Sequence, residues 1–231
     1  MTDHIAVLDK GYVRLVDVMG SDLSVVNAAR ASFAKESHEF SEADERLIRF
    51  LAREGHMSPF RHAMATFEVK APLMVARQWW RYCVGSDHTM EAWSEASRRY
   101  ITMEPEFYVP ERWRKAPAHR KQGSDGEITD DAVNAEATAI LRRLIAAGTD
   151  AYEMLMAEGI APEQARLCLP AYAMYTVWRW TASLQAICHF LNQRLADDAQ
   201  WEIQQYAEAV YRLIEPRFPV SVRELVKGAQ S

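Results

Sequence analysis

Alternation of hydrophobic and polar residues is the first pattern in this chain, and it predicts β-strands. Over residues 63–70, apolar side chains occupy every second position from Ala65 to Val69, with polar side chains between them. A period of two is typical of a strand with one buried face. Residues 12–19 alternate in the same way, and the aromatic-rich residues 172–181 indicate a third strand.

Signals for helix ends separate these strands. Ser21 suits the N-cap of a helix that continues to residue 31. Ser41 and Asp44 form a capping-box pattern ahead of a helix that ends at Gly55. Further helices are predicted over residues 72–81, 133–155, 162–169, 183–195 and 198–213.

The order of these elements indicates the fold class. Regular βαβ alternation is missing, so we expect an α+β fold, in which helices are massed on one sheet. No internal repeat divides the chain, and residues 1–231 are predicted to form a single domain. Residues 114–127 are polar and contain Pro and Gly, so we expect a mobile surface loop there.

Composition and charge narrow the class of partner. Hydrophobic residues make up 49% of the chain and charged residues 26%, as in globular proteins. The net charge of −5 argues against a general nucleic-acid-binding surface, which needs to be basic. Of the 27 basic residues, 21 are arginine, whose guanidinium groups match phosphate and carboxylate oxygens. A high-GC genome produces the same bias, so composition leaves both explanations open.

Several features are missing from the sequence. No signal peptide is visible, and no uncharged stretch approaches the roughly 20 residues that span a bilayer. Cys83, Cys168 and Cys188 are odd in number and far apart, which predicts neither disulfides nor a zinc site. We therefore expect a protein of the reducing cytoplasm, with no bound metal and no membrane partner.

The densest polar group spans residues 77–99. The Ser97-Arg98-Arg99 triplet offers one hydroxyl and two guanidinium groups within three residues. Such a cluster suits a phosphate monoester, because arginine gives paired charged donors and serine adds a neutral one. The alternative is a solvated charged face with i,i+4 ion pairs such as Glu95 with Arg99.

Three classes of catalysis are conceivable for these residues. A Ser-His-Asp hydrolase of the nucleophile-elbow type needs a Gly-x-Ser-x-Gly motif, which is absent. Cys83 could be a nucleophile because Arg81 lies near it, although a buried and inert cysteine is the favoured interpretation. Glu91 and Glu95 could act as an acid–base pair, but on a helix such residues are more often partners in ion pairs.

Longer motifs in the right order give a more specific signal. They run through Gly55-His-x-Ser-Pro-Phe-x-His62, Ala76-Arg-Gln-Trp-Trp-Arg81, Ser94-Glu-Ala-Ser-Arg-Arg-Tyr100, Ala165-Arg-x-x-Leu-Pro170, Phe190-Leu-Asn-x-Arg194 and Ala199-Gln-Trp-Glu-Ile-Gln-Gln-Tyr206. With these motifs the chain resembles the flavin-dependent thymidylate synthases, the ThyX family. The resemblance extends from about Leu8 to Leu213 and is weakest after Arg114.

The resemblance implies a reaction and an assembly. Members of this family convert dUMP to thymidylate, with methylenetetrahydrofolate as carbon donor and NADPH-reduced FAD as hydride source. The resemblance implies a ThyX-type fold, in which helices pack on a central and mostly antiparallel sheet. It also implies a homotetramer whose active sites are shared between subunits. Two alternatives stay open at this point: a methylase of UMP, and a catalytically inactive homologue that binds flavin or nucleotide.

The resemblance also implies site residues. Those matching nucleotide-binding positions are Gln78, Arg81, Glu95, Ser97, Arg98, Arg99, Arg166 and Arg194. Of these, Arg194 matches the catalytic arginine that favours ionisation of the uracil ring. Those matching FAD-binding positions are Ser32, His56, Ser58, Arg81, Tyr82, Cys83, Glu95, Ser183, Gln185 and His189.

One family motif is altered here. The family sequence Arg-His-Arg is Arg81-Tyr82-Cys83 in this chain, and the segment that leads to Ser97 is longer. Tyr82 can still stack on a planar group. We hypothesise that His88, in the longer segment, replaces the missing histidine.

Overall fold

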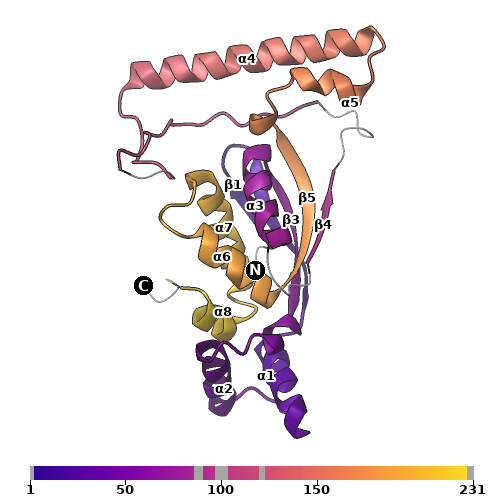
Figure 1. Cartoon of the computed structure of the whole chain (residues 1–231), viewed down its shortest axis with the longest axis vertical. Coiled ribbons are helices and arrows are strands. Elements are labelled where there is room, and N and C mark those ends of the chain that lie inside the picture. The colour runs from indigo at the N-terminus through magenta and orange to yellow at the C-terminus, as the bar shows by residue number, and fades with distance from the viewer. Residues whose placement is uncertain (1–2, 86–90, 97–103, 120–122, 228–231) are drawn as a thin grey trace.

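Antiparallel strands form the middle of the molecule (Figure 1). The structure, a computed structural model, describes residues 3–85, 91–96, 104–119 and 123–227. Within these residues the sheet has five strands, in the spatial order β1 (His4–Val7), β2 (Gly11–Met19), β3 (Met64–Pro72), β5 (Tyr175–Ser183) and β4 (Glu91–Glu95). Every neighbouring pair is antiparallel, in agreement with the α+β prediction.

The predicted alternation places β3 at the centre of this sheet. Phe67 and Val69 are fully buried and lie opposite Trp180 and Trp178 of β5. The intervening side chains of β3 lie on the other face, where Glu68 pairs with arginines of the two neighbouring strands. The strand predicted over residues 172–181 begins later, at Tyr175, because residues 171–173 form a short 3₁₀ turn, η4 (Ala171–Ala173).

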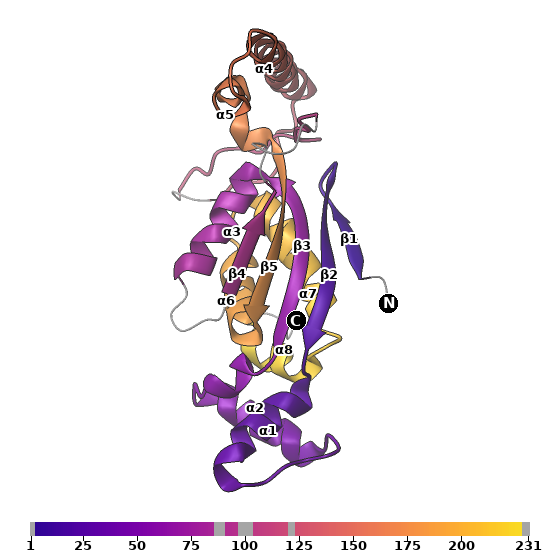
Figure 2. The ribbon, with the colours of Figure 1, turned by 90° about the vertical axis from the view of Figure 1, so that its right-hand side faces the viewer.

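Three helices, α3 (Leu73–Gly85), α6 (Leu184–Arg194) and α7 (Trp201–Ile214), cover one face of the sheet (Figure 2). Aromatic rings contribute to the contact of α3 and α6 with the sheet. The rings of Trp79 on α3 and Phe190 on α6 are stacked 4.3 Å apart. Trp178 and Trp180 meet Trp79 edge-on. Offset and edge-to-face contacts of this kind are the favoured geometries of aromatic pairs.

A lower tier combines the helices between β2 and β3 with the C-terminal helix. It contains α1 (Asp22–Arg30), η1 (Ala31–Phe33), α2 (Glu42–Arg53), η2 (Ser58–Arg61) and the C-terminal α8 (Pro219–Leu225). The Asp44 carboxylate accepts hydrogen bonds from the Ser41 backbone N–H (2.8 Å) and hydroxyl (2.7 Å). It also forms an ion pair with Arg30 (2.7 Å). The capping box predicted at Ser41 is thus confirmed, and it joins α1 to α2.

An upper tier carries the long helix α4 (Asp131–Ala157), α5 (Pro162–Ala165) and η3 (Arg166–Cys168). α4 runs unbroken through Gly148, where a Cβ would lie 2.6 Å from the carbonyl oxygen of Cys168. Gly148 therefore permits close packing of η3 on α4. The ends of the predicted surface loop are joined by a β-bridge between Arg114 and Glu127.

Some expectations from the sequence were incomplete or wrong. Glu91 and Glu95 were expected on a helix, but they begin and end β4, an edge strand. β1 and α8 were not predicted. Among the described residues, none of the helices has the length and hydrophobicity needed to cross a membrane.

The Asp44 network makes a prediction about stability and pH. Burial alone would raise the pKa of the Asp44 carboxyl, but the hydrogen bonds from Ser41 and the charge of Arg30 lower it. The ionised form therefore stabilises the fold above the unfolded pKa of about 3.9, and this contribution is lost as pH falls through the lower folded pKa. Asp44→Asn should lower the free energy of unfolding at pH 7 by about 2–3 kcal/mol.

Denaturant unfolding at a series of pH values measures this effect. The difference between parent and variant should shrink below pH ~4. Asp150→Asn, at an exposed position of α4, is the control and should change stability by less than about 0.5 kcal/mol. A difference that is constant from pH 7 to pH 3 would contradict the assignment.

Candidate active site

The aromatic contact between α3 and α6 brings predicted site residues together. Trp79 on α3 and Phe190 on α6 point into the core. The residues beside them lie along the line where the two helices meet, which we call the seam. Gln78 and Tyr82 lie on the α3 side of this seam, and His189 and Arg194 on the α6 side. The Tyr82 and His189 rings lie 5.7 Å apart. Sequence motifs more than a hundred residues apart thus meet at one place.

Arg194 is the best-defined group at this seam. Its guanidinium carbon lies 4.2 Å from the centroid of the Tyr82 ring, a cation–π contact. Its Nη2 donates to the backbone carbonyl of Gln78 at 3.4 Å. Its Nε is buried and has no hydrogen-bond partner among the residues that the structure describes. A buried N–H of this kind is costly unless an acceptor is supplied, which points to a ligand.

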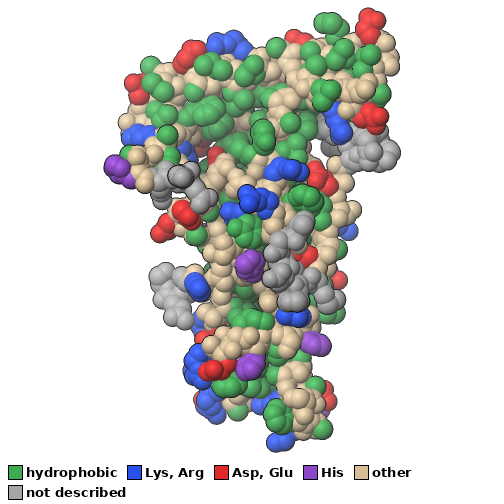
Figure 3. Space-filling view, viewed as in Figure 1, with side chains coloured by type: hydrophobic (Ala, Val, Ile, Leu, Met, Phe, Trp, Pro, Cys, Tyr) green, Lys and Arg blue, Asp and Glu red, His purple; other side chains and the backbone are tan. Residues whose placement is uncertain are grey.

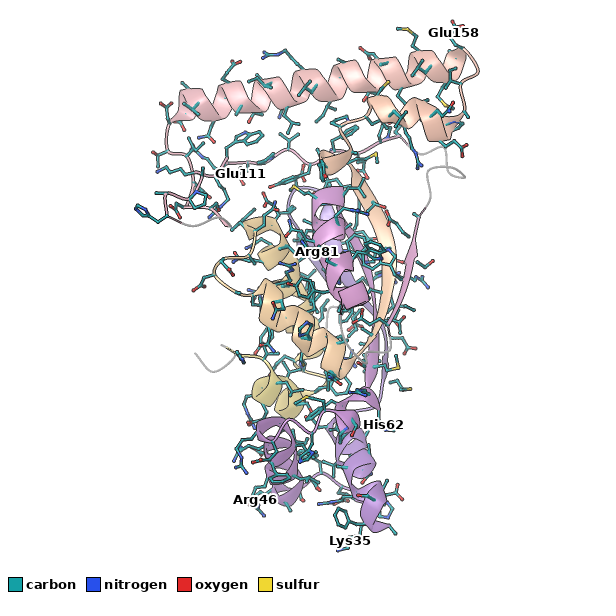
Figure 4. The ribbon with its side chains drawn as sticks, viewed as in Figure 1. Lys35, Arg46, His62, Arg81, Glu111 and Glu158 are labelled. Carbon is teal, nitrogen blue, oxygen red and sulfur yellow. The ribbon has the colours of Figure 1, made fainter. Side chains whose placement is uncertain are left out.

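The electrostatics support an anionic ligand. Burial and, further, the charge of Arg81 lower the pKa of Arg194, while Tyr82 and Asp198 oppose this shift. Arginine remains protonated at neutral pH even so. The seam therefore holds a partly dehydrated positive charge, on which the exposed Arg81, labelled in Figure 4, also acts. An oxyanion or a ring that develops negative charge would be stabilised there.

Gln78 at the seam and Gln185 at the start of α6 both have defined side-chain partners. The Gln78 side chain donates to Gln200, the residue before α7. Gln185 of α6 accepts a 2.7 Å hydrogen bond from Arg61 of η2. Gln200 was not assigned a role from the sequence, although it lies inside one of the family-like motifs. Only its contact with Gln78 reveals it.

Cys83 does not have the environment of a nucleophile. Burial raises the pKa of its thiol, and the charge and hydrogen bond of Glu91 raise it further. The reactive thiolate is therefore scarce at neutral pH. The interpretation of Cys83 as an inert cysteine is supported.

Three residues predicted on the flavin side, Ser32, His56 and Ser58, lie in the lower tier. All three are exposed. Ser32 donates to the carbonyl of Ala29, and the His56 ring stacks on Phe50. In Figure 4 this tier is marked by Lys35 and His62, whereas Arg81 lies in the middle of the molecule. Within one chain these residues are not gathered around Arg194.

Ser183 has a defined role in the fold. Its side chain is fully buried, and its hydroxyl accepts the Ala186 backbone N–H as the N-cap of α6. Its assignment to the flavin side stays a prediction.

The remaining predicted residues lie at the upper edge or outside the described residues. Arg166 is exposed in η3 of the upper tier and donates to the carbonyl of Glu163. Glu95 on β4 accepts a 2.9 Å hydrogen bond from Thr176. The positions outside the described residues are His88, Ser97, Arg98 and Arg99.

The sequence model described as "Thymidylate synthase complementing protein", Thy1, matches residues 14–220. The chain belongs to this family. The match includes all six of the longer motifs found in the sequence, from Gly55 to Tyr206. Of these motifs, the structure brings together at the seam those that contain Gln78, Arg194 and Gln200.

Curated Thy1 relatives carry a more specific name. A flavin-dependent thymidylate synthase of Thermus thermophilus is 43% identical over 217 residues, covering 94% of this chain and 76% of the relative. One from Thermosipho africanus is 39% identical over 223 residues, covering 96% and 94%. A solved structure of the UMP/dUMP methylase PolB from Streptomyces cacaoi, bound with 5-Br dUMP, is also similar. It has a TM-score of 0.81 and 30% identity and covers 95% of this chain and 96% of that one.

The environments of the three cysteines predict the order in which their thiols react with an alkylating reagent. Cys168 is exposed, whereas burial raises the pKa of both Cys83 and Cys188. At pH 8 iodoacetamide should therefore alkylate Cys168 at least about tenfold faster than the other two, because only the thiolate reacts.

Mass spectrometry of digested protein over a time course measures the three rates. Protein unfolded in urea is the control, and its three cysteines should react at similar rates. Alkylation of folded Cys83 as fast as that of Cys168 would restore it as a candidate nucleophile.

Proposed function

We propose that the protein is a flavin-dependent thymidylate synthase that converts dUMP to thymidylate. The observation that carries this proposal is Arg194, which is half-buried and positively charged, and whose buried Nε–H has no partner among the described residues. The names of its relatives support the same reaction. A uracil ring that loses its imide proton gains negative charge at its edge, and Arg194 is suited to stabilise it.

The residues fit a flavin nucleotide in their donor chemistry. Ser32, His56 and Ser58 offer exposed hydroxyl and imidazole groups that suit phosphate and sugar oxygens. Tyr82 and His189 offer rings that suit a planar group. We infer that FAD is bound by these residues, and when bound it supplies the hydride chemistry. NADPH and methylenetetrahydrofolate are the proposed co-substrates, for reduction and for the carbon unit.

This chain's own residues then position the nucleotide. Arg81, with Ser97, Arg99 and Arg166, provides cationic and hydroxyl donors for the phosphate. Tyr82 holds the guanidinium of Arg194 through its ring face, at 4.2 Å. Protein nucleophile chemistry is not part of the proposal, in agreement with the raised pKa of Cys83.

We further propose that the active site is assembled from several copies of this chain, in a homotetramer. The predicted residues of one site lie in all three tiers of a single chain, so other copies are needed to bring them together. An outer stripe of α4 supports assembly. It is formed by Val133, Ala137, Ile140, Leu144, Ala147, Ala151 and Met154.

The stripe has the spacing of a helix–helix contact. Its members alternate four and three residues apart, which is the a/d pattern of packed helices. Ile140, Leu144 and Met154 are 45%, 59% and 66% exposed in the single chain. Apolar side chains gather along this upper tier in Figure 3. An exposed apolar row of this length is typical of an interface.

A charge within the stripe should therefore disrupt assembly. Leu144→Glu should convert the tetramer to smaller species and reduce thymidylate formation at least about tenfold, since an unpaired charge would be buried. Size-exclusion chromatography with light scattering measures the mass.

Ala146→Glu is the matched control, because it adds the same charge at an exposed position of α4 outside the stripe. It should keep the mass and activity of the parent. A Leu144→Glu protein that remains tetrameric would exclude α4 as the interface.

A product assay tests the function directly. Purified protein is incubated with FAD, NADPH and methylenetetrahydrofolate, with dUMP and UMP offered in separate reactions, and products are identified by mass. Thymidylate from dUMP is the expected result. Methylated UMP would favour the ribonucleotide alternative, which the description of PolB as a UMP/dUMP methylase keeps in consideration.

Arg194→Ala should lower the rate of methylation about a hundredfold or more, because the charge that stabilises the anionic ring is lost. FAD should stay bound. Bound FAD is read from its visible absorbance. Near-parental turnover in this variant would refute the role of Arg194. Bound flavin with no product from either nucleotide in the parent would favour a binding protein.

A further inference from the structure

Gln200 occupies the N-cap position of α7 but does not cap it. No side-chain hydrogen bond closes the first turn of this helix. Ser, Thr, Asp and Asn are the preferred residues at such a position, and glutamine is not among them. The Gln200 side chain instead reaches Gln78 on α3 and Glu202 on its own helix. The position is therefore better suited to these two contacts than to the stability of the helix.

The donors of Gln200 are both in use. Its Nε2 donates to the Glu202 carboxylate at 2.8 Å and is 3.5 Å from the sulfur of Met74. Its Oε1 must then be the acceptor of the Gln78 Nε2. The amide of Gln78 thereby has a defined orientation, with one N–H directed to Gln200.

Tyr108 fixes the end of this series of hydrogen bonds. Its hydroxyl donates to the other oxygen of Glu202, at 3.4 Å. Burial and the negative charge of Glu202 raise the pKa of Tyr108, so the phenol keeps its proton. Glu202 therefore accepts from both sides, and the amide of Gln200 cannot turn over without losing the bond to Glu202.

We propose that Gln200 is a positioning residue for nucleotide binding, which holds the Gln78 amide so that its carbonyl oxygen and its second N–H face the nucleotide. This inference rests on the proposed function and on the family resemblance, in which Gln78 matches a nucleotide-binding position. A carbonyl oxygen cannot accept from a phosphate dianion, which has no proton to donate. The carbonyl oxygen of Gln78 therefore accepts from a sugar hydroxyl or from the uracil imide N–H. The second N–H of Gln78 can donate to any oxygen of the nucleotide, including those of the phosphate.

Gln200 also lies at the boundary of a cavity. The cavity has a volume of about 520 Å³, and Met74, Tyr108, Gln200 and Glu202 all line it. The groups that orient Gln78 thus border open space rather than the packed core. Substitutions at Gln200 and Glu202 should consequently perturb folding little.

The test is isothermal titration calorimetry of the flavin-loaded protein with dUMP. Gln200→Met keeps the length of the side chain and removes its hydrogen bonds. It should weaken dUMP binding about tenfold, as loss of an oriented hydrogen bond predicts. Gln78→Met should weaken binding by at least as much. The double variant should be no weaker than Gln78→Met alone, because Gln200 acts only through Gln78.

Gln205→Met is the matched control, with the same substitution at a half-buried position of α7, and it should bind dUMP like the parent. Glu202→Gln is a second, isosteric variant that leaves one acceptor oxygen for two donors, Gln200 and Tyr108, so the Gln200 amide is held less firmly. It should weaken binding severalfold with an unchanged unfolding midpoint. In steady-state assays both Gln200→Met and Glu202→Gln should raise KM for dUMP more than they lower kcat, which a general loss of structure would not do.

The outcomes separate the inference from the proposed function. Parental dUMP affinity in Gln200→Met, with weakened affinity in Gln78→Met, would overturn the positioning role and leave the function intact. Additive losses in the double variant would also overturn it. Unchanged affinity in both single variants would remove Gln78 from the nucleotide site and the inference with it. Failure of the parent to bind dUMP would overturn the proposed function itself.

Discussion

The stacked contact between Trp79 and Phe190 is the constraint on which the candidate site depends. It sets α3 against α6 over the central strands, and every residue of the seam takes its place from one of these two helices. The indole N–H groups of Trp79, Trp178 and Trp180 are buried without partners among the described residues. Each such group costs about 1–3 kcal/mol, so the aromatic packing must outweigh this cost. Precise helix placement is obtained from shape rather than from polar bonds.

The environment of the Arg194 guanidinium follows from this placement of α3 and α6. Because α3 and α6 are held close, the guanidinium is enclosed between the Tyr82 ring and the Gln78 carbonyl. Partial burial strengthens its field at the seam, and its Nε is buried without a partner among the described residues. Tyr82 contributes to this enclosure because a phenol ring supports a cation through its face. The packing of α3 on α6 thus both partly dehydrates the Arg194 guanidinium and fixes its position.

Sequence alone predicted the elements whose signals are local. β3 was predicted from its alternation and the start of α2 from Ser41 and Asp44, because burial on one face and helix capping each need only a few residues. β4 was missed because its glutamates, Glu91 and Glu95, have the i,i+4 spacing of a helix, and only pairing with β5 makes it a strand. Gln200 was missed as a site residue for the same kind of reason, since its role depends on contact with Gln78, 122 residues away.

The proposed site residues differ in how firmly contacts within one chain hold them in place. Arg194 is fixed by ring and backbone contacts within the chain, so its position does not depend on another copy. Arg166, in contrast, is exposed on a short turn and is held by a single hydrogen bond to the Glu163 carbonyl. A residue so loosely held gains a defined position only when a second surface meets it. Under the proposed assembly, the charge that acts on the base would therefore be preorganised in each chain, whereas the charge from Arg166 would become ordered on association.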